Sequence, residues 1–170
     1  MSTIETIVII LLLVLILCFA WALTEINSLK KLMKEKPRTS DSDTLKLRLQ
    51  AYERLSVLTE RISFQNLVTR IPNAGLSSRE MQGALIENIK KEYEYNVSQQ
   101  IYVLPDIWKA VNNLKEQNIY IINQLASSLP PHASAMDLSK QIVDFTIRNP
   151  KATLSNLVHD AINYEAQKLM

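Results

Sequence analysis

Glycine is the residue that this chain lacks most clearly, since 170 residues contain only two, Gly75 and Gly83. Phosphate-binding loops and dinucleotide-binding turns need several closely spaced glycines, because their backbone must approach the ligand and adopt positive φ angles. The two glycines of this chain are isolated from one another. Both kinds of nucleotide site are therefore excluded.

Cysteine and histidine are equally scarce, with one cysteine, Cys18, and two histidines, His132 and His159. A single cysteine cannot build a disulfide framework. Neither histidine has a second histidine or a carboxylate at the spacing of metal ligands, and no nucleophile elbow is present. We therefore predict a non-enzymatic protein without a metal or a cofactor.

The chain also lacks a large excess of charge of either sign, because its 19 basic and 17 acidic residues give a net charge of only +2. Nucleic-acid-binding domains usually carry a concentrated basic stripe with interleaved aromatic residues. No segment of this chain has that composition. We therefore expect no nucleic-acid partner.

What the chain does contain is an unbroken apolar run of seventeen residues over 7–23, IVIILLLVLILCFAWAL. Extended by Thr6 and Thr24, a helix over this run is about 28 Å long, close to the roughly 30 Å thickness of a bilayer's hydrocarbon core. No lysine or arginine precedes the run, as one would in a cleaved signal peptide. The run therefore predicts an uncleaved transmembrane helix.

Positive charge on one flank predicts the orientation of this helix. No basic residue precedes the run, and five follow it closely: Lys30, Lys31, Lys34, Lys36 and Arg38. Such juxtamembrane basic residues mark the cytoplasmic side of a membrane helix. We therefore expect a single-pass protein of the inner membrane, with its N-terminus outside, its C-terminal domain in the cytoplasm, and membrane lipid as one partner.

The remaining chain is predicted to be helical, since its apolar residues recur at intervals of three and four without two-residue alternation. The predicted fold class is all-α, with an N-terminal transmembrane helix followed by a small cytoplasmic bundle of about five helices. The predicted parts are a transmembrane helix with a basic extension over 1–36, a polar linker over 37–44 and the helical domain over 45–170. The expected helices of that domain cover residues 45–71, 78–102, 106–129, 135–148 and 150–168. Ser77 and Glu80 have the spacing of a capping box at the start of the second.

Two Glu-Arg pairs mark the first helix of the domain. Glu53-Arg54 and Glu60-Arg61 are seven residues apart, so both pairs lie on one side of the helix. A solvated stripe of salt bridges fits this spacing, and so does a charge ladder that faces a partner in an oligomer. These four residues are the candidate interaction face.

Polar residues interrupt the apolar faces of the next two helices. The candidate polar cluster consists of Glu92, Asn96, Gln99, Gln100 and Asn118. An unpaired buried polar group costs roughly 1–3 kcal/mol, so these side chains must be solvated, paired with other buried groups or part of a site. A hydrogen-bonded network that fixes the register of the helices and a site for a ligand or partner both remain open.

Three segments carry a resemblance to a known family. LRLQAYERLSVLTERIS (47–63), EYEYNVSQQIYV (92–103, with the nearby Trp108) and KEQNIYIINQLA (115–126) resemble a family of uncharacterised single-pass membrane proteins of the Bacteroidota. The resemblance implies an N-terminal membrane helix followed by a small helical domain, and it carries no assigned activity. It directs attention to Asn96 and to the Ser98-Gln99-Gln100 segment.

Two functions are compatible with these features. The leading hypothesis is a membrane-anchored, non-enzymatic adaptor or accessory subunit, whose cytoplasmic bundle binds a protein partner or forms a homo-oligomer. The alternative is a membrane-tethered ligand-binding or sensory bundle with a polar pocket around Glu92, Asn96, Gln99 and Asn118.

Overall fold

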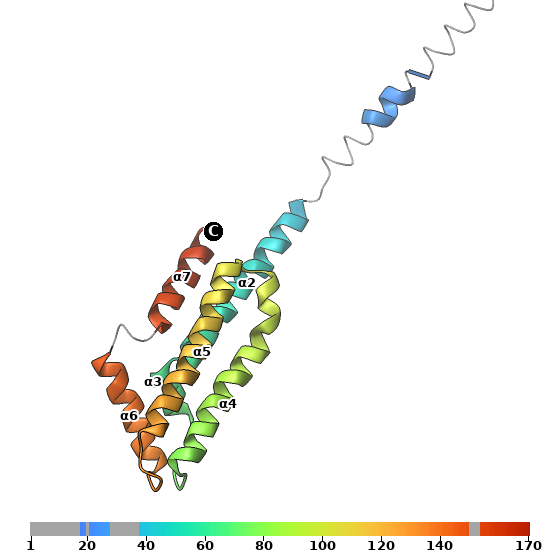
Figure 1. Ribbon diagram of the computed structural model, residues 1–170. Coiled ribbons are helices and arrows are strands. Elements are labelled where there is room, and N and C mark those ends of the chain that lie inside the picture. Colours follow the sequence, from blue (N-terminus) through green and yellow to red (C-terminus); the bar gives the residue numbers. More distant parts are fainter. Residues whose placement is uncertain (1–17, 20, 28–37, 150–153) are drawn as a thin grey trace, which may run out of the picture. The chain divides into compact units, whose positions relative to one another are not determined.

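The computed structural model describes residues 18–19, 21–27, 38–149 and 154–170 (Figure 1). Within the range 38–149, side chains are described from residue 42 onward. Every regular element of residues 38–149 and 154–170 is helical, and these ranges contain no strand. The chain divides into two compact units, Met1–Thr44 and Leu45–Met170.

The predicted transmembrane helix requires a correction. No helix in the described part of the chain is both long enough and apolar enough to cross a membrane. A span needs about 20 predominantly apolar residues in one helix, and residues 21–27, which are described, include Glu25. This finding overturns the predicted fold class with its transmembrane helix, and the predicted single-pass location in the inner membrane. Most of the apolar run, residues 7–17, lies outside the described residues.

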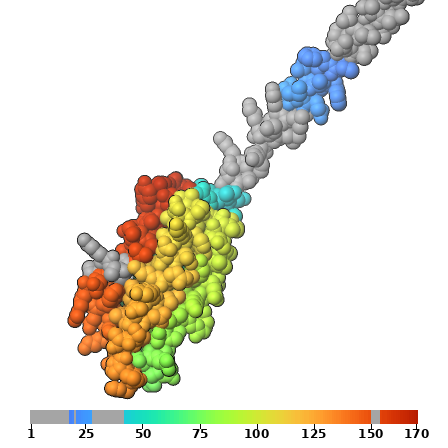
Figure 2. Space-filling model, viewed as in Figure 1, coloured from blue at the N-terminus to red at the C-terminus, as the bar shows by residue number. Residues whose placement is uncertain are grey.

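The helices of the larger unit follow one another with short connections. In chain order they are α2 (Arg38–Ile62), α3 (Phe64–Arg70), α4 (Ser78–Asn96), the 3₁₀-helix η1 (Val97–Ile101), α5 (Pro105–Ser127), α6 (Ala135–Arg148) and α7 (Ser155–Gln167). Figure 1 shows α4 and α5 running antiparallel side by side, with α6 and α7 along the edge of the bundle. The space-filling view shows α4 and α5 covering most of one face of this unit (Figure 2).

One helix expected over residues 45–71 is divided in two. The backbone is extended at Ser63, with φ −59° and ψ 142°, so α2 ends at Ile62 and α3 begins at Phe64. The Ser63 hydroxyl donates to the carbonyl oxygen of Glu60 at 2.8 Å. A serine side chain that bonds to the nearby backbone competes with the helical pattern, which explains a break without proline or glycine.

The core is formed by large apolar side chains that are completely or almost completely buried. They include Leu55, Leu58 and Ile62 of α2, Leu67 of α3, Met81, Leu85 and Ile89 of α4, Leu114 and Ile122 of α5, Leu138 and Ile142 of α6, and Val158 and Ile162 of α7. Every α-helix from α2 to α7 therefore places one face in the same core.

Two helices begin with the same capping device. At α4 the Ser77 amide donates to the Glu80 carboxylate at 2.8 Å, and the Glu80 amide donates back to the Ser77 hydroxyl at 3.3 Å. At α6 Ser134 and Asp137 make the same two bonds, at 2.9 and 3.3 Å. The predicted capping box at Ser77 is confirmed. The one at Ser134 was not predicted.

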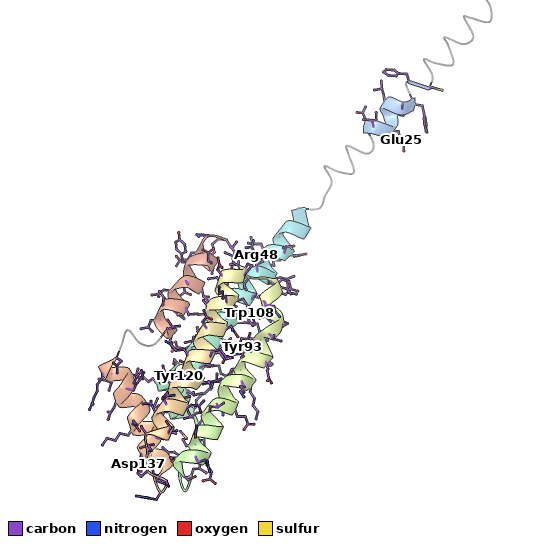
Figure 3. The ribbon with its side chains drawn as sticks, in the orientation of Figure 1. Glu25, Arg48, Tyr93, Trp108, Tyr120 and Asp137 are labelled. Atoms are coloured by element: carbon purple, nitrogen blue, oxygen red, sulfur yellow. The ribbon has the colours of Figure 1, made fainter. Side chains whose placement is uncertain are left out.

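These two caps lie side by side. The Ser78 amide donates to the carbonyl oxygen of Ala133 at 2.9 Å, and the Ala135 amide donates to that of Leu76, also at 2.9 Å. This isolated antiparallel bridge holds the starts of α4 and α6 together, at the end of the bundle where Asp137 is labelled in Figure 3.

The lowered pKa values of the two capping carboxylates, Glu80 and Asp137, lead to a prediction of how the stability of the fold depends on pH. Hydrogen bonds from the backbone and hydroxyl of Ser77 lower the pKa of Glu80 from its ordinary 4.5, and those of Ser134 lower the pKa of Asp137 from its ordinary 3.8. A lowered pKa in the folded state stabilises the fold at higher pH, and this contribution is lost as pH falls through the folded-state value. We therefore expect the double variant Glu80→Gln/Asp137→Asn to lose melting temperature less steeply than the unmodified chain between pH 5 and 2.

Thermal unfolding followed by circular dichroism measures these slopes. The matched control is Glu94→Gln/Asp160→Asn, which makes the same changes at exposed positions that cap no helix. Parallel pH profiles for the unmodified chain and the capping variant would contradict the prediction.

Candidate functional site

A groove of about 410 Å³ runs between α2 and α4. It brings together residues from both predicted sets. Its lining consists of Gln50, Glu53, Arg54, Val57, Leu58 and Arg61 from α2, and Glu92, Tyr95 and Asn96 from α4. We call this feature the α2–α4 groove.

Glu92 joins three helices at one end of the groove. Its Oε1 atom lies 2.9 Å from Nε of Arg61 on α2 and 3.4 Å from Nη1 of Arg70 on α3. Only 15% of the Glu92 side chain is exposed, whereas 52% of the Arg61 side chain is. One carboxylate thus serves two guanidinium groups, which leaves an excess of positive charge at this end.

Arg54 lies one heptad before Arg61 and makes a different contact. Its Nη2 atom donates to the Tyr95 hydroxyl at 3.3 Å, and its guanidinium carbon lies 5.3 Å from the centroid of the Tyr95 ring. No carboxylate among the described residues forms an ion pair with Arg54. Tyr95 itself is 72% exposed. This cation and this ring are therefore both exposed at the groove.

The four residues of the candidate interaction face do not share one environment. Glu53, Arg54 and Arg61 line the groove. Glu60 is directed toward α3, where its carboxylate accepts a hydrogen bond from Nδ2 of Asn66 at 2.7 Å. The two arginines of the repeat thus connect α2 with α4, and Glu53 remains at the exposed rim.

The residues of the candidate polar cluster are not brought together as a set. Glu92 and Asn96 line the groove, and Nδ2 of Asn96 donates to the carbonyl oxygen of Glu92 in its own helix at 2.8 Å. Gln99 is buried and donates to Oγ of Ser98 at 3.1 Å. Gln100 is exposed.

Asn118 of α5 has a separate role in the core. Its side chain is completely buried, and Nδ2 donates to the carbonyl oxygen of Ile62 at 2.8 Å. Because α2 ends at Ile62, that carbonyl lies beyond the hydrogen-bonding pattern of the helix. Oδ1 of Asn118 is buried and has no partner among the described residues. Asn118 therefore supports the break between α2 and α3 and does not line the groove.

The predicted juxtamembrane basic residues cannot be placed at this site. Lys30, Lys31, Lys34 and Lys36 lie outside the described residues. Arg38 is the first residue of α2, and its side chain is likewise outside the described part.

Three residues of this site were not predicted from the sequence. Gln50 and Val57 line the groove, and Arg70 pairs with Glu92 at its end. The sequence contained a signal for Val57, because it is an apolar residue between Glu53-Arg54 and Glu60-Arg61. In the structure its side chain is 51% exposed. Arg70 had no such signal, since 22 residues separate it from Glu92.

An aromatic pair stands on the adjoining α4–α5 face. The ring centroids of Tyr93 and Trp108, both labelled in Figure 3, are 5.1 Å apart. Nζ of Lys115 lies 4.2 Å from the Tyr93 centroid. These side chains pack α5 against α4. They lie outside the groove lining.

The groove is lined by hydrogen-bonding groups and by apolar side chains. It offers guanidinium, phenol and amide donors beside the apolar surface of Val57. In the described ranges of the chain, no group of three or more histidine, cysteine, aspartate or glutamate side chains is arranged to hold a metal ion.

The Glu92 junction predicts a loss of stability on neutralisation. Glu92→Gln keeps the size of the side chain but removes the charge that Arg61 and Arg70 share, so we expect about 1–2 kcal/mol less free energy of unfolding. Urea unfolding at low ionic strength measures it. Glu87→Gln is the matched control on the same helix, because its ion pair with Lys91 is exposed on both sides, and it should change nothing measurable. Equal effects of the two substitutions would contradict the prediction.

Comparison with known proteins identifies a family. The model of a family described as "Family of unknown function (DUF7935)" matches residues 1–169. No curated protein and no solved structure matches the chain.

Proposed function

Since the chain belongs to this family of unknown function, we propose its function from the groove itself: a non-enzymatic adaptor that binds a segment of a protein partner in the α2–α4 groove. The narrower resemblance to proteins of the Bacteroidota rests on residues 47–63, 92–103 and 115–126, and a source in that phylum is part of this proposal. The proposal does not include a membrane anchor.

The observation that carries the proposal is the pair formed by Arg54 and Tyr95. Arginine and tyrosine are enriched among the residues that dominate binding energy at protein interfaces. Here the two stack on one another at the groove, and the cation lacks a carboxylate partner among the described residues. A partner carboxylate can accept two parallel hydrogen bonds from such a guanidinium group.

The lining also indicates the chemistry of the partner segment. Val57 supplies an exposed apolar surface between Arg54 and Arg61. A segment that carries an aliphatic or aromatic side chain beside an aspartate or glutamate would cover Val57 and pair with Arg54 at once. Glu53 at the rim would select against a segment with a second acidic residue on its own side, because like charges repel.

The alternative of a single polar ligand pocket finds less support. Of its four residues, Glu92 and Asn96 line the groove, whereas Gln99 bonds with Ser98 and Asn118 bonds with the end of α2. A small ligand in the groove would therefore not reach the latter two.

Site-specific photo-cross-linking tests the proposal. Tyr95 and Tyr120 are both exposed tyrosines, at 72% and 63%, and only Tyr95 lines the groove, whereas Tyr120 is on α5 (Figure 3). Each is replaced by benzoylphenylalanine in the full chain, expressed in its native cells. We expect one defined protein adduct from position 95 and none of the same mass from position 120. The absence of an adduct at position 95, or the same adduct at both positions, would refute the proposal.

A further inference from the structure

α6 carries an exposed apolar stripe on the flank of the face that it places in the core. Leu138 and Ile142 are fully buried. On the adjoining flank Met136 is 60% exposed, Ile147 is 71% exposed and Val143 is also exposed. These three residues are seven and four positions apart, so they form one stripe along the helix. A surface helix normally carries polar residues outside its core face, so this exposed apolar stripe is a candidate contact surface.

A second apolar wall stands beside this stripe. A groove of about 510 Å³ lies between α6 and the end of α3, lined by Val68, Ile71 and Pro72 on one side and by Met136 and Val143 on the other. α6 itself lies at the edge of the bundle (Figure 1). The stripe and the groove together can accommodate one further helix.

Lys140 and Asp144 place opposite charges beside this stripe. They are one turn apart, and both line the groove. Neither forms an ion pair or a hydrogen bond with any residue in the described part of the chain, and they do not pair with each other. The Asp144 side chain is half-buried in the single chain. A covering helix that supplies a cation near Asp144 and an anion near Lys140 would satisfy both.

We propose that the occupant is α6 of a second copy of this chain, packed antiparallel about a two-fold axis near the level of Ile142. In such an interface each residue that contacts another is contacted by its equivalent in return. With a rise of about 1.5 Å per residue, Lys140 then lies level with Asp144 of the second copy and Asp144 with its Lys140. Met136 comes within about 2 Å of the level of the second copy's Ile147, and Val143 lies close to its equivalent.

The charges of Lys140 and Asp144 also disfavour a parallel orientation of the two α6 helices. A parallel pairing of the same two stripes would bring each lysine level with a lysine and each aspartate level with an aspartate, which is unfavourable. The dimer surface shares no residue with the α2–α4 groove. The proposed dimer therefore stands or fails independently of the proposed function.

Charge exchange tests both the occupant and the orientation. Sedimentation velocity of the full chain at micromolar concentration and low salt should show a dimer of 2 × 19.4 = 38.8 kDa. Lys140→Glu places two acidic residues opposite two acidic residues, and Asp144→Lys does the same with basic ones, so each variant alone should dimerise at least tenfold more weakly. An equimolar mixture of the two variants should recover the dimer, because every pair across the interface is then opposite in charge.

Val143→Glu is the second variant, since it places two carboxylates at the centre of the seam, and it should be monomeric. All substituted positions are at the surface or half-buried, and a circular dichroism spectrum like that of the unmodified chain verifies the fold. A monomeric unmodified chain would overturn the proposal. So would a dimer that persists in both single charge variants, or one that the mixture fails to restore, because association would then use another surface or another partner.

Discussion

Asn118→Asp is expected to lower the free energy of unfolding at pH 7 by about 3–5 kcal/mol, because it leaves an uncompensated charge in the core. Asn118 is completely buried and donates its amide hydrogen to the carbonyl oxygen of Ile62 at 2.8 Å. An ionised carboxylate has no hydrogen to donate and faces a carbonyl oxygen of like partial charge. The substitution therefore removes the bond that supports the end of α2 and adds the cost of desolvating an ion.

The pH dependence of this variant identifies the cause. Burial raises the pKa of the introduced carboxyl above the value of about 3.9 that it has in the unfolded chain. The protonated acid can donate to the Ile62 carbonyl, so the loss of stability should be smallest below that pH and should grow as pH rises through the folded-state value. Guanidinium unfolding of this variant and of the unmodified chain at pH 7 and at pH 3 compares the two conditions.

Asn113→Asp is the matched control, since Asn113 is an exposed asparagine on the same helix, α5. It should change the free energy of unfolding by less than about 0.5 kcal/mol. If Asn118→Asp lowered the free energy of unfolding no more than this control, the hydrogen bond from Asn118 to the end of α2 would not contribute to stability as proposed.

Leu58→Ala is expected to cost about 2–5 kcal/mol of stability, the range for removing a fully buried leucine from a core. Leu58 lines the base of the α2–α4 groove but has no exposed surface. Truncation leaves a cavity under the groove, because the surrounding core relaxes only in part. Urea unfolding followed by circular dichroism gives the value.

The neighbouring residue supplies the control for Leu58→Ala. Val57 lines the same groove but is 51% exposed, so Val57→Ala should change the free energy of unfolding by less than about 0.5 kcal/mol. It should nevertheless weaken partner binding, because Val57 supplies the exposed apolar surface there. Equal destabilisation by the two substitutions would show that Leu58 is not part of a rigid core.

The helices could be predicted where local signals were strong. The helix expected over 135–148 is found as α6 with those bounds, because Pro130-Pro131 precede it and Asn149-Pro150 follows its end. The break at Ser63 had no comparable signal, since neither proline nor glycine is near it. Only the structure shows that the Ser63 side chain and Asn118 together support the break.

The candidate site was predicted in separate pieces. Periodicity indicated that Arg54 and Arg61 share a side of α2 and that Glu92 and Asn96 share a side of α4, but it does not show which sides of two helices meet. The ion pair of Arg61 with Glu92 joins residues more than thirty positions apart. The contact of Asn118 is to a backbone carbonyl, and a pattern of side chains contains no information about such an acceptor.

The apolar run at the N-terminus gave the strongest signal in the sequence and led to the prediction that the structure corrects. No helix among the described residues meets both requirements of a span, which are sufficient length and apolar composition. The described helices that are long enough, such as α2 and α5, carry charged residues along their length. The function proposed above accordingly rests on the bundle alone.

The most direct test of the central claim is the dissociation constant of the partner captured through position 95, titrated into the full chain by isothermal calorimetry. Arg54→Gln removes the groove cation that forms no ion pair with a carboxylate of the described residues. Arg79→Gln is the matched control, at an exposed arginine of α4 outside the groove. We predict at least tenfold weaker binding for Arg54→Gln, which corresponds to about 1.4 kcal/mol, and an unchanged constant for Arg79→Gln. Equal affinities for the unmodified chain and Arg54→Gln would contradict the claim that the α2–α4 groove is the binding site.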